Sequence, residues 1–435
     1  MVIGASLAGS LAAATVAAAG HDVVLIERDQ VPTTAQPRPG IPHGRFPHLL
    51  LPAGVRGLEA LLPGIIEELV DAGALLVSIP QDVRILTPFG WFPSFPSDLH
   101  ALACSRSLLD HQVRIRVLRD HHITVQDRTT VTGLGITAGR MRDIRVQQRG
   151  TGTATTLPAT LVVDASGRRS HTPEWLAQAG YRGHASQRID AGVSYAVRTY
   201  PPPTERRTPR QVLNLQAAPP ADLVFGILIP TEDGIRQAGI GAMPPHTAPR
   251  TADEFTRAMS LLRHSALAEA LDVAPTGPVR TFHPGASRWH RYDRWHRWPN
   301  GLIVLGDALC TFNPIYGQGM SVAISQVLAL RRALSATTFS TGGHRSLRRD
   351  LARTVRPAWT LSSTEDWRFP HTSGQFRPFS KLIHRALDHL LSIAMTDQVL
   401  AHHLAEIFAL TRPPTSLASR DVLRAVATGR ACSAG

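Results

Sequence analysis

A glycine-containing turn near the start of the chain carries residue types suited to binding a dinucleotide. Gly4, Ser6 and Gly9 follow a short apolar start, and after an alanine-rich stretch the apolar run Val23–Ile26 ends in Glu27. A strand, a glycine turn, a helix, a strand and an acid in this order are what a dinucleotide-binding βαβ unit requires. Gly4 permits a tight turn, Gly9 permits close packing of helix on sheet, and N–H groups at the helix start face a pyrophosphate. Glu27 is placed to accept hydrogen bonds from a ribose.

This turn departs from the usual pattern in two ways. Ser6 stands where the middle glycine usually lies, and it adds a side chain near the phosphates. Only three residues precede Gly4, whereas a core strand usually has about five or six. Either the first strand is short or Met1 is not the true start, in which case an upstream extension should raise cofactor retention.

A second glycine-containing turn lies late in the chain. The apolar run 301–305 ends in Gly306 and Asp307, and the segment continues through Gly317 and Gly319 into a helix with apolar residues at helical spacing. Glycines at a helix start allow a ligand close to the backbone, where unpaired N–H groups and the positive end of the helix dipole favour negative charge. A third apolar run, 161–164, also ends in an acid, Asp164.

The elements that position these turns predict an α/β fold. Apolar strands alternating with helices predict a Rossmann-like domain with a parallel central sheet. Alternating segments predict a separate antiparallel sheet over 190–200, 211–216, 222–230 and 235–242. Helical spacing predicts helices over 54–74, 105–118 and 252–271, and amphipathic helices with proline breaks from 346 to 430.

Composition narrows the functional classes. The net charge is +13, yet Lys381 is the single lysine, so arginine supplies almost all the positive charge, as codon bias would produce. The absence of a basic stripe or an aromatic RNA-binding motif argues against nucleic-acid binding. Three distant cysteines share no ligand spacing, so we predict no metal site and no disulfides. Without an eighteen-residue apolar run, we expect a cytoplasmic protein with no stable membrane attachment.

In the order and spacing of its motifs, the chain resembles FAD-dependent monooxygenases, the fold group of aromatic hydroxylases, squalene-type epoxidases and flavin halogenases. The resemblance is nearest to bacterial epoxidases and hydroxylases of natural-product pathways, which suggests a role in secondary metabolism such as antibiotic biosynthesis. The motifs that carry it, besides the first glycine turn, are Pro42-His43-Gly44-Arg45, Ser105-Arg106, Asp164-Ala165-Ser166-Gly167-Arg168 and Gly306–Met320. The last segment is the most specific of these signals.

The resemblance implies a set of FAD-binding residues. These are Gly4, Ser6, Leu7, Ala8, Gly9, Glu27, Arg28, Arg45, Arg106, Val131, Asp164, Gly306, Asp307, Gly317, Gly319 and Met320. In this reading Glu27 binds the adenosine ribose, Arg28 and Arg106 lie along the phosphates and ribityl chain, Val131 meets adenine, and Asp307 binds the ribityl hydroxyls.

Two of these assignments have a structural alternative. Asp164 either contacts the cofactor or only braces turns at the end of its strand. Arg45, like the nearby His48, either points toward the flavin or decorates a loop.

No catalytic side chain is assigned, because FAD carries the chemistry while Pro314, Gly317 and Gly319 position it. The resemblance implies insertion of one atom of O2 into an apolar small molecule through a flavin hydroperoxide. Epoxidation of an olefin in polyketide or terpenoid biosynthesis is the leading expectation. The alternatives are aromatic hydroxylation, a flavin-dependent reductase or dehydrogenase of prenyl-type substrates, and a non-catalytic flavin or nucleotide-binding protein. Halogenation is disfavoured, because halogenases need a lysine in the N-terminal half.

Electrons would come from NAD(P)H, either directly or through a separate flavin reductase, since no second dinucleotide fingerprint is present. Candidate substrate residues are Tyr195, Phe225, Ile227, Phe312 and Tyr316, although such residues are often plain core. Asp366 and Arg368 either line the pocket or form a structural ion pair.

We expect three regions. The FAD-binding domain takes 1–185 and 275–345, the substrate-binding sheet takes 78–100 and 186–274, and a helical region takes 346–435.

Overall fold

A five-stranded parallel sheet forms the centre of the computed structural model, which describes residues 1–435 except 184, 204–210, 272, 336–340, 376–377 and 429–435. Its strand order is β20-β12-β1-β2-β8, and all four neighbouring pairs run parallel. The strands are β1 (Val2–Ile3), β2 (Val23–Ile26), β8 (Ile123–Gln126), β12 (Val162–Asp164) and β20 (Leu302–Val304). The predicted α/β fold with a parallel central sheet is confirmed, and its first strand is short.

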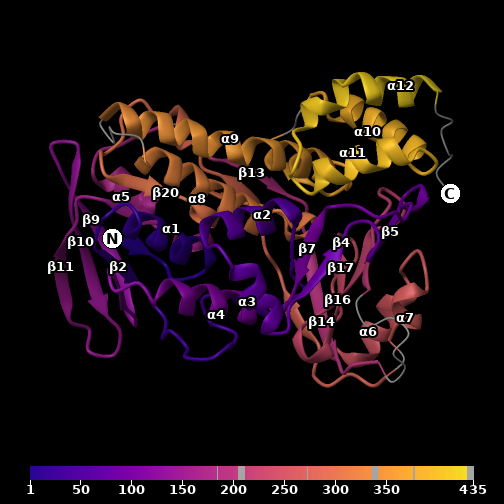
Figure 1. Cartoon of the computed structure of the whole chain (residues 1–435), viewed down its shortest axis with the longest axis horizontal. Helices are drawn as coiled ribbons and strands as arrows, with labels where there is room; N and C mark the ends of the chain where they lie inside the picture. The colour runs from indigo at the N-terminus through magenta and orange to yellow at the C-terminus, as the bar shows by residue number, and fades with distance from the viewer. Residues whose placement is uncertain (184, 204–210, 272, 336–340, 376–377, 429–435) are drawn as a thin grey trace.

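Helices from distant parts of the chain cover this sheet (Figure 1). The helix α1 (Leu7–Ala17) packs between α4 (Arg106–Val117) and α8 (Gly319–Ser335), while α2 (Pro52–Leu61) packs on α8. Residues on almost every face of α1 are buried. The small alanine side chains at many of its positions allow the neighbouring helices to pack close to it. The predicted helix over 54–74 is two helices, α2 and α3 (Ile65–Asp71), since Gly64 has a φ of 84° between them.

Beside the central sheet, β9 (Thr129–Thr137), β10 (Arg140–Gln148) and β11 (Ala154–Pro158) form an antiparallel sheet at one end of the molecule (Figure 1). Two smaller sheets have the strand orders β3-β7-β4 and β21-β19-β13-β22. Their strands are β3 (Leu49–Leu50), β4 (Leu75–Ser78), β7 (His100–Ala103), β13 (Gln187–Asp190), β19 (Ser287–Trp289), β21 (Cys310–Thr311) and β22 (Ser373–Gly374). The segment η1 (Pro42–Arg45) precedes β3 as a short 3-10 helix.

The second large sheet has the order β18-β14-β17-β16-β15-β5-β6. Its strands are β5 (Val83–Thr87), β6 (Gly90–Trp91), β14 (Ser194–Tyr200), β15 (Val212–Leu215), β16 (Val224–Pro230), β17 (Arg236–Ala242) and β18 (Arg280–Phe282). One face packs on α6 (Ala252–Met259) and α7 (Ala266–Glu269), which replace the single helix predicted over 252–271. The sheet extends past the predicted boundary at residue 274, because β18 pairs with β14.

The C-terminal region is helical, as predicted. Its helices are α9 (Thr341–Asp366), α10 (Ser380–Ala394), α11 (Gln398–Phe408) and α12 (Arg420–Thr428). The last three gather above one end of the second sheet (Figure 1). Among the described residues, no helix has the length and apolar character that crossing a membrane would require.

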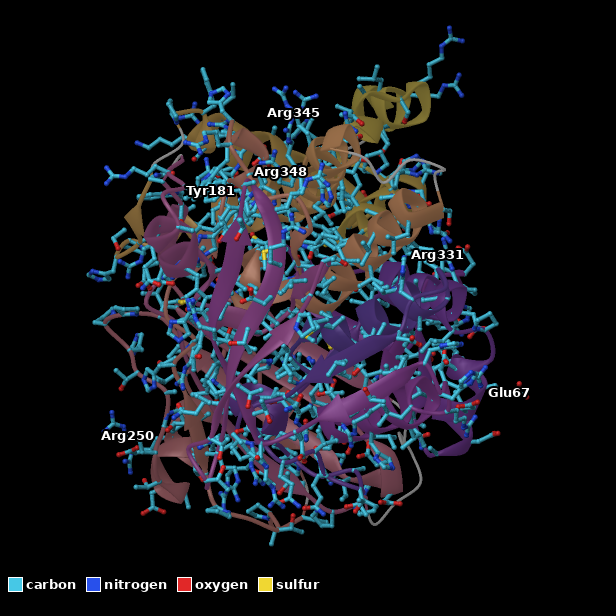
Figure 2. The ribbon with its side chains drawn as sticks, turned by 90° about the vertical axis from the view of Figure 1, so that its left-hand side faces the viewer. Glu67, Tyr181, Arg250, Arg331, Arg345 and Arg348 are labelled. Carbon is cyan, nitrogen blue, oxygen red and sulfur yellow. The ribbon has the colours of Figure 1, made fainter. Side chains whose placement is uncertain are left out.

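Exposed arginines occur at separate parts of the surface. Figure 2 shows Arg250, Arg331 and Arg345 at three separate parts of the periphery, and all three are exposed. Arg348, by contrast, is half-buried and lies over the Trp298 ring, with 5.1 Å from its Cζ to the ring centroid.

Candidate functional site

The first glycine turn is as tight as its spacing predicts. Gly4 has a φ of 96°, and a Cβ on it would lie 2.6 Å from the carbonyl oxygen of Ala165. A Cβ on Gly9 would lie 1.7 Å from the carbonyl oxygen of Gly4. Both positions therefore require glycine, because the backbone at β1, α1 and the end of β12 leaves no room for a side chain.

At the end of β2, the Glu27 carboxylate is buried and directed back at this turn. Its Oε2 accepts a hydrogen bond from the Ala5 N–H at 2.9 Å, and its Oε1 accepts one from the Asp29 N–H at 3.1 Å. The Arg38 guanidinium pairs with the same carboxylate and also donates to the Ala5 carbonyl oxygen at 2.6 Å. Glu27 therefore lies beside the turn, where its sequence position predicts.

Arg38 was not predicted from the sequence. It lies between β2 and η1, in a proline- and glycine-rich stretch without periodicity, so no pattern distinguishes it from the other arginines. In the structure its side chain is buried. The only available signal was its closeness in sequence to the acid that ends β2.

Arg106 links the turn to α4. Ser105 caps this helix by accepting a hydrogen bond from the Leu108 N–H, which places Arg106 at the first helical position. The Arg106 guanidinium donates to the Ser6 hydroxyl at 2.9 Å and pairs with Asp110 at 3.0 Å. Ser6, the residue that departs from the glycine pattern, thus accepts a hydrogen bond from a buried arginine.

The second turn meets the first directly. Gly306 has a φ of 61°, and a Cβ on it would lie 3.1 Å from the Cβ of Ala8. Burial raises the pKa of the neighbouring Asp307, while the positive charges of Arg168 and Arg106 lower it. Two segments about three hundred residues apart are therefore brought together around Arg106, as the sequence predicts for two parts of one cofactor site.

His48 also lies close to this group, and Arg45 belongs to the same loop. Burial, followed by the charge of Arg106, lowers the pKa of His48 to about 4, so its ring is neutral at physiological pH. Burial likewise lowers the pKa of His43, with His48, Arg106 and Arg168 adding to the effect. The Arg45 side chain is exposed and makes no hydrogen bond or ion pair with the part of the chain that the structure describes.

The start of α8 offers open backbone. After Asn313 and the 3-10 turn η6 (Pro314–Tyr316), Gly317 has a φ of 65°. A Cβ on either Gly317 or Gly319 would meet no atom within 4 Å. The buried Oε1 of Gln318 accepts no hydrogen bond within the described residues. Open backbone and an unused acceptor at a helix start fit the polar pyrimidine edge of a flavin ring.

Asp164 is fully engaged by its own turn. Its two carboxylate oxygens accept hydrogen bonds from the Ser166 N–H at 2.9 Å, the Ser166 hydroxyl at 2.6 Å and the Thr172 hydroxyl at 2.6 Å, and Ser170 adds a further one. The side chain is completely buried. These contacts favour the alternative in which Asp164 braces the strand end, in place of a direct cofactor contact.

The remaining predicted cofactor residues lie around these two turns. Arg28 follows Glu27 and lies 3.8 Å from Asp29, with 39% of its side chain exposed. Val131 is buried in β9, and this strand is tied to Glu27 by the Thr129 N–H, which donates to the Glu27 carbonyl oxygen at 2.9 Å. Both residues therefore lie at the Glu27 end of the site, where adenosine is expected. Leu7 and Ala8 lie in the first turn of α1, and Met320 lies in the first turn of α8.

The predicted substrate residues of the second sheet lie on its face opposite α6 and α7. Tyr195 and Phe225 form an edge-to-face pair with 5.5 Å between ring centroids, and both pair in register with Gly241 of β17. A Cβ on Gly241 would lie 1.8 Å from Phe225, so the glycine makes room for these rings. Ile227 lies over Gly239 in the same way. Small residues in β17 thus leave this face to aromatic and aliphatic side chains of its neighbours.

The two substrate candidates in the second turn have different surroundings. The Phe312 ring is buried in the core of the central sheet, with its centroid 6.4 Å from that of Trp359. The Tyr316 hydroxyl donates to Asp366 Oδ1 at 2.9 Å. Phe312 is therefore a core residue, because α9 covers the side of the turn on which it lies.

The alternative of an Asp366–Arg368 ion pair is wrong. Arg368 pairs instead with Glu365 at 2.8 Å and with Asp388 at 2.9 Å. Asp366 accepts hydrogen bonds from Asn313 and Tyr316. The i,i+2 spacing directs the two side chains to different faces at the end of α9.

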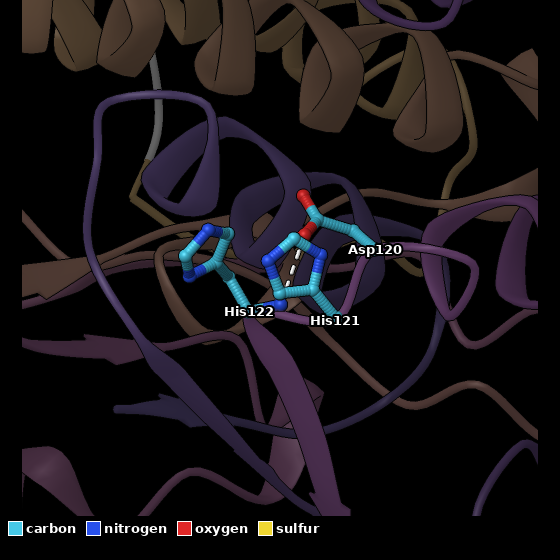
Figure 3. A group of neighbouring side chains, drawn as sticks. All are labelled: Asp120, His121 and His122. Carbon is cyan, nitrogen blue, oxygen red and sulfur yellow. Dashed lines mark hydrogen bonds between the residues drawn. The ribbon is translucent and has the colours of Figure 1, made fainter.

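A group of possible metal ligands lies away from this site. Asp120, His121 and His122 place one ligand atom each within 4.8 Å of one another on the loop before β8 (Figure 3). His122 is already hydrogen-bonded to Asp22 at 2.8 Å between Nδ1 and Oδ1, which raises its pKa. This contact joins the amino ends of β2 and β8. Glu27 lies at the carboxyl end of β2, so the histidine group is at the opposite edge of the sheet from the candidate site.

Comparisons with known proteins agree with this geometry. The family model described as "FAD binding domain" matches residues 1–359. Protein Rv3254 of Mycobacterium tuberculosis is 32% identical over 431 residues, covering 94% of this chain and 89% of that protein. Kynurenine 3-monooxygenase of Salinispora arenicola is 28% identical, covering 77% of this chain and 72% of that enzyme.

Solved structures share the fold at low identity. The flavin-dependent brominase Bmp2 superposes with a TM-score of 0.67 at 15% identity, covering 94% of this chain and 92% of that one. PqsL of Pseudomonas aeruginosa, described as a probable FAD-dependent monooxygenase, superposes with a TM-score of 0.58 at 16% identity. The match covers 94% of this chain and 98% of that one. These similarities show that the fold is shared over 94% of this chain.

Proposed function

Because this chain belongs to the FAD-binding domain family of FAD-dependent monooxygenases, we propose that it transfers one oxygen atom from O2 to an apolar, unsaturated small molecule. Epoxidation of an olefin, such as a polyketide or terpenoid intermediate, is the leading reaction. The observation that carries the proposal is the meeting of the two glycine turns around Arg106, beside an aromatic sheet face. Bound FAD would accept electrons from NAD(P)H, directly or through a separate reductase, and activate O2.

In this proposal the protein binds and positions, and no side chain attacks the substrate. Glu27 and Arg106 would hold the ribose and the phosphates, and Asp307 would bind the ribityl hydroxyls. Gly317 and Gly319 would present backbone N–H groups to the pyrimidine edge. The neutral His48 ring supports this arrangement, because it adds no positive charge close to Arg106.

The sheet face with Tyr195 and Phe225 would bind the substrate. Tyr195 reaches the second turn, because its hydroxyl donates to Asn313 Oδ1 at 3.2 Å. The face therefore adjoins the turn at which the flavin ring would rest. Aromatic and aliphatic side chains on it suit an apolar substrate, because they gain from burial and offer few hydrogen bonds.

Aromatic hydroxylation is the second candidate, and the relatives named kynurenine 3-monooxygenase favour it. Both reactions use the same cofactor arrangement and differ in the substrate presented to it. The product separates them, since an olefin gives an epoxide and an arene gives a phenol.

The test is oxygen consumption by purified protein reconstituted with FAD. NADH and NADPH are each supplied, with and without a flavin reductase, together with panels of olefins and arenes. Incorporation of one atom from ¹⁸O2 into a product supports the proposal. Turnover that continues without oxygen would point to a reductase or dehydrogenase, and protein that takes up no FAD would refute the proposal outright.

A further inference from the structure

A buried acid joins the three regions of the molecule, and no step proposed above uses it. Asp366 is the last residue of α9, and 1% of its surface is exposed. Its Oδ1 accepts hydrogen bonds from Asn313 Nδ2 at 2.8 Å and from the Tyr316 hydroxyl at 2.9 Å. Asn313 in turn accepts from Tyr195 of β14. A carboxyl group of the C-terminal region therefore holds the turn before α8 and connects it to the substrate sheet.

The location of this acid is unfavourable for a charge. Buried carboxylates usually have a cationic partner, but Arg368 is engaged with Glu365 and Asp388. The end of α9 adds a negative dipole end, and its last turn contains no basic residue. A carboxyl group placed where neutral residues would be more stable points to a requirement other than stability.

We propose that Asp366 is a positioning residue for the flavin-facing turn, and that its ionised form holds Asn313 and Tyr316 so that Gly317 and Gly319 present their backbone to the ring. An ionised acceptor makes hydrogen bonds roughly twice as strong as a neutral one. The turn has few other restraints on its outer side, because both glycines face open space. This inference rests on the proposed function, since it assigns the flavin ring to that turn.

The charged and titratable neighbours make this position sensitive to pH. Burial raises the pKa of Asp366 to about 7, and the hydrogen bonds from Asn313 and Tyr316 oppose the rise. Glu365 on α9 and Asp190 on β13 raise it further. Tyr195 and Tyr316 remain neutral, because burial followed by the charge of Asp366 raises the pKa of both. Asp366 is thus the group of this cluster whose charge changes near neutral pH.

The test measures FAD affinity of the full-length protein between pH 6 and pH 8 by equilibrium titration. Wild-type affinity should rise about fivefold with pH, whereas Asp366→Asn should change by less than twofold. Asp388→Asn is the matched control, because it removes one carboxylate from the same region. Asp388 lies on α10 and pairs with Arg368, away from the Asn313 and Tyr316 hydrogen bonds. Tyr316→Phe removes a hydrogen bond that lowers the pKa, so its transition should move to higher pH.

Hydrogen exchange of amides 315–319 in flavin-free protein separates this inference from the proposed function. Protection factors, corrected for intrinsic exchange rates, should rise with pH in the wild type and stay constant in Asp366→Asn. Equal pH profiles in the two proteins, or loss of the wild-type profile in Asp388→Asn, would overturn the role of Asp366. If FAD fails to bind while protection follows pH as expected, the proposed function fails, and what stands is that ionised Asp366 holds the turn in place.

Discussion

The two glycine turns of this protein look alike in sequence and differ in what surrounds their glycines. At Gly4 and Gly9 an added Cβ would strike backbone at 2.6 Å and 1.7 Å, whereas at Gly317 and Gly319 it would meet nothing within 4 Å. Glycine in the first turn is therefore required by the protein's own packing. Gly306 of the second turn is also packed, 3.1 Å from the Cβ of Ala8, but glycine at positions 317 and 319 leaves the backbone open. Glycine is thus enforced by contacts at positions 4 and 9, whereas the backbone at positions 317 and 319 lies open.

Substitution of Gly9 by alanine should have the largest effect. The Cβ would overlap the Gly4 carbonyl oxygen, and neither α1 nor β1 can move without disturbing the core. We expect a loss of at least ~3 kcal/mol in the free energy of unfolding, or failure to fold. Chemical denaturation measures this free energy of unfolding. If the variant is as stable as the wild type, packing does not require glycine at position 9.

Asp307→Ala should leave the fold intact and lower FAD affinity about a hundredfold, because hydrogen bonds to a charged group contribute about 1.5–3 kcal/mol each. Flavin occupancy after purification and equilibrium titration measure the change. Asp366→Ala should lower occupancy far less, since Asp366 acts on the turn and does not touch the flavin. The reverse ranking would mean that the site is wrongly mapped.

Asp366→Asn should stabilise the flavin-free protein at higher pH. The folded-state pKa is about 7 and the ordinary value is 3.8, so the folded protein binds more protons than the unfolded chain between these values. Wild-type stability therefore falls as pH rises from about 4 to 7, and the asparagine variant avoids this loss. We expect a relative gain of about 2 kcal/mol between pH 5 and pH 8, measured by urea denaturation. A difference in unfolding free energy between the two proteins that does not change with pH would contradict this prediction.

Gly319→Ala should have the smallest effect and shows the contrast with Gly9 most directly. Alanine favours a helix by about 1 kcal/mol over glycine, so unfolding should be unchanged or slightly harder. FAD affinity should fall about threefold to tenfold, because the methyl group enters the space that the ring would use. A large loss of stability here would show that the second turn is packed like the first.

Local sequence order was sufficient to predict the central sheet and both turns. Four of the five parallel strands are apolar runs, and each of these four reaches a glycine or an acid within a few residues. The position of Glu27 beside Ala5 follows from the geometry of one βαβ unit. The convergence of Gly306 with Ala8 was implied by the resemblance to flavin monooxygenases, and the structure brings the two residues together at the carboxyl ends of β1 and β20.

Long-range packing could not be predicted in the same way. Arg38 lies in a segment without periodicity, and its burial against Glu27 depends on the path of that loop. Phe312 resembles a pocket residue in its motif, but α9 covers it and makes it core. The ion pairing of Arg368 likewise depends on α10, which begins about a dozen residues later.

The sequence by itself determined which backbone positions must be glycine and where acids end the strands, because these depend on a few consecutive residues. Only the tertiary structure decided which glycines face the protein and which face open space, and which partner each buried charge has. Those outcomes depend on segments far apart in the chain, whose approach is set by the packing of whole helices and sheets.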